Sequence, residues 1–105
     1  MNVQLKKGVL DLCVLSLLSQ RDMYGYELVT AVSKGIEISE GTIYPLLKRI
    51  KDEGYVTTYL VESPEGPSRK YYAITGAGLS VTTDLEREWR KVVDGVEKVL
   101  RGEYL

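Results

Sequence analysis

The stretch from residue 39 to residue 54 constrains the fold most, because it combines a buried helical face with an unusual opposite face. Four apolar residues follow the i, i+3, i+4, i+7 spacing of a buried helix side: Ile43, Leu46, Leu47 and Ile50. The same spacing brings a glycine, a phenol, a ring and a cation to the other side: Gly41, Tyr44, Pro45 and Lys48. Such a face suits contact with a polyanion, since Tyr and Thr donate to phosphates or base edges and Lys adds charge. The alternative is a surface helix with an unusual first turn.

Composition limits the chemistry that the chain can perform. Its 105 residues are enough for one domain with a modest core. The sequence contains no histidine, which removes imidazole bases, Ser-His-Asp arrangements and histidine metal ligands. The single cysteine, Cys13, lies in an apolar helical run, which is typical of a small core residue. We therefore expect no enzyme, no cofactor and no metal site.

The formal net charge of −1 is spread evenly along the chain. Residues 1–75 carry nine Lys and Arg against nine Asp and Glu, and residues 76–105 carry five against six. A DNA-binding surface in the first part would therefore depend on local sorting of charge, and its affinity should fall steeply with salt.

The longest apolar run covers residues 9–18. Asp11 and Ser16 interrupt it, and it is too short to cross a bilayer. It also lacks the small-residue cleavage site of a signal peptide, so we expect a cytoplasmic protein without a membrane segment.

Local patterns predict the order of the elements. Residues 5–20 are apolar nearly all round, which predicts a central helix or one covered by a second subunit. A second helix should follow Met23 and end near Lys34, with Gly35 as a left-handed cap and with its inward face formed by Tyr24, Leu28, Ala31 and Val32. Residues 36–38 alternate and leave room for one strand pair. The third helix should begin at Ser39 or Thr42 and end at Gly54.

A hairpin and a long helix complete the pattern. Residues 55–61 and 69–75 read as strands joined by a turn at residues 63–68, which places Arg69 and Lys70 beside the tip. Thr75 can cap a last helix that runs from about residue 76 to residue 102 and is roughly 40 Å long. Its apolar residues follow a heptad seam: Leu85, Trp89, Val92, Val96 and Val99. One small domain cannot cover this stripe, so we expect a homodimer with the first helix as a second interface layer; the alternative is a helix folded back on its own domain.

This element order predicts a mainly α fold with a small β-hairpin. Residues 1–75 should form a winged helix-turn-helix DNA-binding domain, and residues 76–105 a C-terminal dimerisation helix. In that geometry the third helix enters the major groove of double-stranded DNA and the hairpin, or wing, lies along the backbone.

Several segments together resemble the PadR family of transcriptional regulators. The resemblance covers residues 5–75 and rests on residues 15–18, 24–28, 41–50, 53–56 and 66–75, above all on the string around Tyr44-Pro45 and on the wing strand Arg69-Lys70-Tyr71-Tyr72. It implies a dimeric repressor that binds a partly palindromic operator and is often released by a small aromatic effector. The short C-terminal part is similar to that of the small subfamily. The DNA-contacting residues that the resemblance implies are Tyr26, Thr42, Tyr44, Pro45, Lys48, Arg69 and Lys70.

Trp89 is the strongest candidate for binding an effector. It is the only Trp and lies on the seam, and in some small-subfamily members a Trp at the corresponding place stacks on flat drugs in a channel between subunits. Leu12, Ser16 and Leu85 could form the walls of such a site. The seam carries no obvious acidic residue, which favours a neutral aromatic ligand. Two alternatives stay open: a winged-helix protein-interaction module, and a small-molecule-binding dimer without a DNA role.

Overall fold

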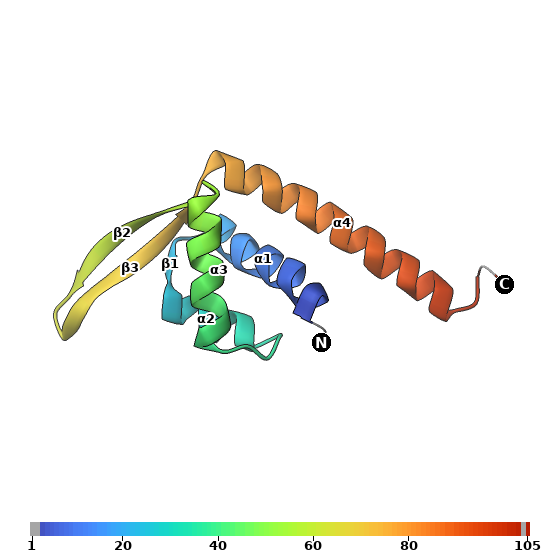
Figure 1. The fold of residues 1–105 in the computed structure, drawn as a ribbon, viewed down its shortest axis with the longest axis horizontal. Helices are drawn as coiled ribbons and strands as arrows, with labels where there is room; N and C mark the ends of the chain where they lie inside the picture. Colours follow the sequence, from blue (N-terminus) through green and yellow to red (C-terminus); the bar gives the residue numbers. More distant parts are fainter. Residues whose placement is uncertain (1–2, 104) are drawn as a thin grey trace.

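The computed structural model describes the backbone of residues 3–103 and 105, and the side chains from residue 8 onward within that range. The elements follow in the order α1 (Val3–Gln20), β1 (Met23–Tyr24), α2 (Gly25–Ser33), α3 (Glu40–Asp52), β2 (Val56–Ser63), β3 (Gly66–Ile74) and α4 (Gly76–Leu100). Figure 1 shows α1, α2 and α3 gathered together, with the β2–β3 wing and α4 extending away from them. The predicted mainly helical winged fold is confirmed.

The core lies between the first three helices and the base of the sheet. The predicted face of α3 is fully buried, as are much of α1 and the inner side of α2. The buried apolar residues are Leu10, Val14, Leu15, Leu18, Met23, Leu28, Val32, Ile43, Leu46, Leu47, Ile50, Val56 and Tyr72. Helical periodicity therefore identified the buried face of α3 and, in α2, the buried Leu28 and Val32.

The sheet has three antiparallel strands in the order β1-β3-β2. The short edge strand β1 was not predicted: Met23 pairs with Tyr72, and Tyr24 pairs with Tyr71. Tyr24 is consequently a strand residue on the sheet rather than part of the inward face of α2, as the sequence had suggested. Residues 36–38 form no strand, although their alternation had left room for one, because β1 takes the edge of the sheet. Ile36 and Ile38 pack against the core from a loop instead.

The ends of α2 and α3 show where α3 begins and which glycines end the two helices. Ser39 is the N-cap of α3, so Pro45 lies inside the helix. As predicted, α3 ends just before Gly54, which has a positive φ of 81°. The Tyr55 N–H donates to the Ile50 carbonyl at 2.9 Å, which closes the helix end. Among the described glycines only Gly54 and Gly102 have positive φ, so the predicted left-handed cap at Gly35 is wrong. The chain leaves α2 through right-handed turns instead, with the Gly35 N–H bonded to Val32.

The wing is longer than predicted, because its turn contains only Pro64 and Glu65. Arg69 lies opposite Val61 and Lys70 lies opposite Leu60, so both cations are in the middle of the hairpin rather than beside its tip. Side chains alternate along a strand. Lys70 therefore shares the face of buried Tyr72, which is the inner face of the sheet, while Arg69 lies on the outer face.

The last helix packs on α1. Thr75 caps it as predicted, accepting a 3.0 Å hydrogen bond from the Gly78 N–H. Its second half runs away from the rest of the molecule in Figure 1, which helps to give overall dimensions of 61 × 27 × 20 Å. Over the described part of the chain, no helix combines the length and the apolar character that a membrane span requires.

Candidate nucleic-acid interface and ligand site

The outer face of α3 is open to solvent. Thr42, Tyr44, Pro45 and Lys48 are all exposed, while the opposite face of the same helix is fully buried. The Lys48 side chain is 79% exposed and forms a 3.0 Å ion pair with Asp52 one turn later. Such an exposed pair contributes about 0.3–0.5 kcal/mol, so a phosphate can compete with Asp52 for the ammonium group.

Arg49, the next residue on α3, has a different role. Its guanidinium donates a 2.6 Å hydrogen bond to Asp11 of α1 and lies 3.6 Å from Glu53. The hydrogen bond to Asp11 raises the pKa of Arg49 above its ordinary value. This half-buried pair fastens α3 to α1, so Arg49 holds α3 in place.

Tyr44 rests on the beginning of α2. A Cβ atom added to Gly25 would lie 2.6 Å from Tyr44 Cε1 and 2.8 Å from its hydroxyl, so the ring occupies the space that a side chain at position 25 would need. Gly25 is buried and Tyr44 remains 44% exposed. Tyr26 follows at once and is exposed too. The junction of β1 and α2 thus lies beside two of the predicted DNA-contacting tyrosines.

The outer face of the sheet carries a row of tyrosines that the sequence did not reveal. Tyr59 stacks on Tyr71 with ring centroids 5.6 Å apart, and Tyr24 meets Tyr71 edge-on at 5.4 Å. The guanidinium of Arg69 lies 4.7 Å from the centroid of the Tyr24 ring. The Tyr59 hydroxyl donates a 2.6 Å hydrogen bond to Asp22, which raises the pKa of Tyr59. Finding this row requires the strand register, which no local pattern provides.

All seven predicted DNA-contacting residues are exposed, and they come from three elements. Tyr26 belongs to α2 and four others to α3, while Arg69 and Lys70 point to opposite faces of β3. The structure thus places Tyr44 beside the start of α2, where Tyr26 also lies, and it separates the two wing cations.

The predicted effector residues lie around two hollows on either side of Trp89. The first, of about 430 Å³, lies between α1, α2 and α4 and includes Leu12, Ser16 and Trp89. The second, of about 230 Å³, lies between α1 and α4 and includes Leu12, Leu85 and Trp89. Trp89 is 37% exposed and forms a wall of both. The first hollow has the volume of an ordinary ligand pocket.

Carboxylates lie closer to Trp89 than the sequence suggested. Glu86 lines the first hollow and Glu88 the second, so carboxylates border both hollows although neither lies on the seam itself. The heptad pattern hid them, because residues three before and one before Trp89 flank the seam rather than lie on it. Burial raises the pKa of the Cys13 thiol, which also lines the first hollow.

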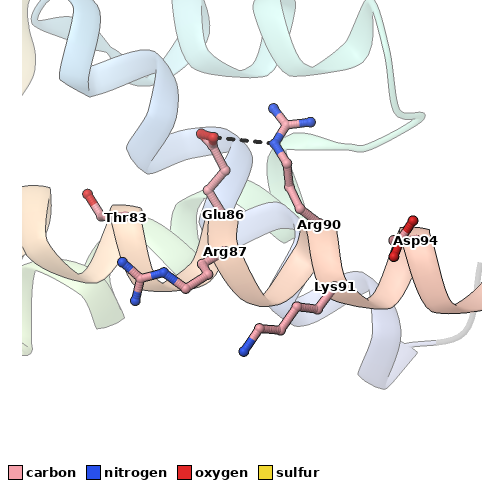
Figure 2. Close-up of a pocket in the computed structure, with 6 residues that line it drawn as sticks. All are labelled: Thr83, Glu86, Arg87, Arg90, Lys91 and Asp94. Atoms are coloured by element: carbon pink, nitrogen blue, oxygen red, sulfur yellow. Dashed lines mark ion pairs between the residues drawn. The ribbon is translucent and has the colours of Figure 1, made fainter.

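Figure 2 shows the polar side of α4 beyond these hollows. Glu86 and Arg90 form an ion pair at 3.5 Å and project to one side of the helix, while Arg87 and Lys91 project to the other. These residues line a depression of about 510 Å³ to which α4 alone contributes. Glu86 and Arg90 also border the first hollow, so their ion pair lies at its rim. Among the described residues no cluster of three or more Cys, Asp or Glu could hold a metal ion.

The sequence and fold both match known proteins. Residues 14–84 match the Transcriptional regulator PadR-like family. A PadR-like transcriptional regulator from Bacillus cereus is 42% identical, with a TM-score of 0.82 over 92% of this chain and 96% of that one. A Streptococcus transcriptional regulator is 35% identical, with a TM-score of 0.83 over 93% and 98% of the two chains. An uncharacterised protein of Lysinibacillus sphaericus is 30% identical over 91% of this chain and 92% of its own.

The family match covers most of the winged domain described above, including α3, the wing and the start of α4. Relatives at this level of identity extend the similarity to nearly the whole chain. The chain therefore belongs to the PadR-like family of transcriptional regulators, which are DNA-binding regulators and not enzymes.

Proposed function

We propose that the protein is a homodimeric repressor that holds two recognition helices against one operator and is released by a small aromatic effector. The observation that carries this proposal is the uncovered apolar stripe of α4. Trp89, Val92, Val96 and Val99 are 37%, 52%, 50% and 64% exposed, and Leu100 is 76% exposed. Contiguous apolar stripes of this kind are typical of interaction surfaces.

A second copy of the chain is the partner that best fits the stripe. Its residues keep the heptad spacing of helices that pair with one another. Charged pairs one turn apart, such as Asp94 with Lys98, flank it and leave its centre apolar. We therefore divide the chain into a winged DNA-binding domain, residues 1–75, and a dimerisation helix, residues 76–105.

Sedimentation equilibrium tests the dimer. The parent protein should sediment at twice the chain mass of 11.8 kDa, and Val96→Glu should sediment as a protomer because it puts a charge on the seam. Lys91→Gln is the matched control, since it changes the net charge by the same amount from the polar side of α4. A parent protein that stays monomeric at high concentration would refute the dimer.

For DNA binding we propose that α3 enters the major groove and that the wing lies along the backbone. The exposed phenol, hydroxyl and ammonium groups on α3 support this arrangement, because each can donate to phosphates or base edges. In a two-fold dimer the half-sites should lie about 34 Å, or one helical turn, apart. Selection from a random duplex library followed by footprinting tests this: protection should cover two adjacent major grooves on one side of the duplex.

The repressor role is the one that the family resemblance implies. In vitro transcription from a promoter that carries the selected operator tests it, because a repressor lowers the transcript yield in proportion to its occupancy of the operator. A rise in transcript yield would make the protein an activator.

The hollows beside Trp89 support the effector proposal. A flat aromatic ligand can stack on the exposed indole, and the Glu86–Arg90 pair offers polar contacts at the rim. Ligand binding would favour one arrangement of the two subunits and so change the distance between the recognition helices. Because Trp89 is the only tryptophan, quenching of its emission reports occupancy directly. Operator affinity that is equal with and without a saturating quencher would refute release by an effector.

A further inference from the structure

The outer face of the sheet suggests how one DNA-contacting group is held ready. We propose that Tyr24 is a positioning residue for DNA binding, whose ring holds the Arg69 guanidinium so that its N–H groups face a phosphate of the duplex. The inference rests on the proposed function, in which the wing lies along the DNA backbone. Tyr24 itself need not touch the DNA.

The first support is the geometry of Arg69. Its guanidinium carbon lies 4.7 Å from the centre of the Tyr24 ring, within the range of a cation–π contact. A guanidinium over a ring uses its face for that contact and keeps its five N–H donors at its edges. Within the described part of the chain, Arg69 forms no ion pair and no side-chain hydrogen bond, so these donors are available.

The second support is that the Tyr24 ring is itself fixed from several sides. It makes a T-shaped contact with Tyr71, which is directly opposite in the sheet and stacks in turn on Tyr59. Its backbone N–H donates to Glu27 at 3.2 Å, which ties it to the first turn of α2. The Tyr59 hydroxyl in turn donates to Asp22, two residues before Tyr24.

These contacts have a consequence for binding. An arginine that moves freely loses rotamer freedom when it contacts a phosphate, and an arginine already restrained loses less. A cation–π contact at an exposed site corresponds to about a 2- to 5-fold change in an equilibrium constant. Removing the ring should therefore weaken DNA binding by about this factor per subunit, although the charge on Arg69 is unchanged.

A double-mutant cycle with a duplex of about 30 base pairs and random sequence, long enough for two half-sites, tests the inference. Anisotropy titrations at several salt concentrations would compare the parent with Tyr24→Leu, Arg69→Gln and the double variant. Arg69→Gln should weaken binding and make the salt slope shallower by about one per contact. Tyr24→Leu should weaken binding about 2- to 5-fold per subunit in the parent and have no effect in the Arg69→Gln background.

Two controls separate positioning from a general loss of structure. Tyr24→Phe keeps the ring and should bind DNA like the parent protein. Tyr59→Leu removes a ring that packs on Tyr71 but does not itself contact Arg69, so it should weaken DNA binding less than Tyr24→Leu does. Additive effects of Tyr24→Leu and Arg69→Gln, or an equal loss in Tyr59→Leu, would overturn the inference and leave the wing contact standing. An Arg69→Gln variant that binds like the parent would instead refute the wing contact in the proposed function.

Discussion

Replacing Gly25 by alanine should lower DNA affinity without unfolding the protein. The added Cβ would lie 2.6 Å from Tyr44 Cε1, which is about 1 Å closer than carbon atoms in favourable contact. Gly25 does not have a positive φ, so alanine fits the backbone. Because alanine lowers the conformational entropy of the unfolded chain, it should stabilise the folded state by about 0.4–1 kcal/mol. The overlap is with a half-exposed ring that can swing into solvent. The expected change is therefore a displaced Tyr44 in an intact domain.

The magnitude follows from what Tyr44 contributes to binding. One hydrogen bond to a charged phosphate is worth about 1.5–3 kcal/mol. A dimer would place two copies of Tyr44 on one duplex, so the expected loss reaches about 3–6 kcal/mol, or about 10²- to 10⁴-fold in affinity, if both contacts are lost. Anisotropy titrations with a random duplex at low salt measure this loss, and thermal melting followed by circular dichroism measures the stability.

The matched control is Gly76→Ala. Gly76 is also the first residue of a helix, but no atom lies within 4 Å of the position where its Cβ would be. It should bind DNA like the parent protein. Tyr44→Ala combined with Gly25→Ala should bind no worse than Tyr44→Ala alone. Unchanged affinity in Gly25→Ala would refute the idea that Gly25 seats a DNA-contacting ring, whatever the change in melting.

Three further predictions concern other residues. Lys48→Ala should weaken binding to all duplexes alike and reduce the salt slope by about one per subunit, as salt titrations would measure; loss at one base pair alone would mean that Lys48 reads sequence. Asp11→Asn should lower the free energy of unfolding by about 1–3 kcal/mol, because it leaves the half-buried Arg49 with a weaker partner. Asp52→Asn, which removes an exposed charge, should change it by less than about 0.5 kcal/mol. Urea denaturation measures both values. Burial raises the pKa of Tyr72 above its ordinary value of about 10, so the stability that its neutral phenol supplies is complete below pH 10 and is lost as the pH rises through the folded-state pKa. Melting temperatures of Tyr72→Phe should therefore fall less between pH 9 and about 12 than those of the parent, and parallel curves would contradict this.

The hollows beside Trp89 illustrate a site that was only half predictable. The lone tryptophan on an apolar seam and its neighbours Leu12, Ser16 and Leu85 could be named from helical spacing. Their division between two hollows, with a carboxylate in each, depends on how α1, α2 and α4 pack together. Spacing along one helix predicts the direction in which a side chain points from the helix axis. It does not predict which side chains the neighbouring helices cover and which they leave exposed in a hollow.

The sequence by itself determined the helices, the hairpin and the exposed face of α3. These features are local: burial on one side of an element imposes a period of 3.6 or 2 residues, and that period is written in consecutive positions. The end of α3 at Gly54 was equally local, since a left-handed residue there favours glycine.

Tertiary structure alone decided which residues hold the groups that we propose to contact DNA. Asp11 and Arg49 are 38 positions apart, and the contacts of Tyr24 with Tyr71 and Arg69 depend on an edge strand that two residues form. The seat of Tyr44 on Gly25 likewise arises only when α2 and α3 meet. Such contacts follow from strand register and helix packing, which are set by the whole core and leave no periodic trace in the sequence.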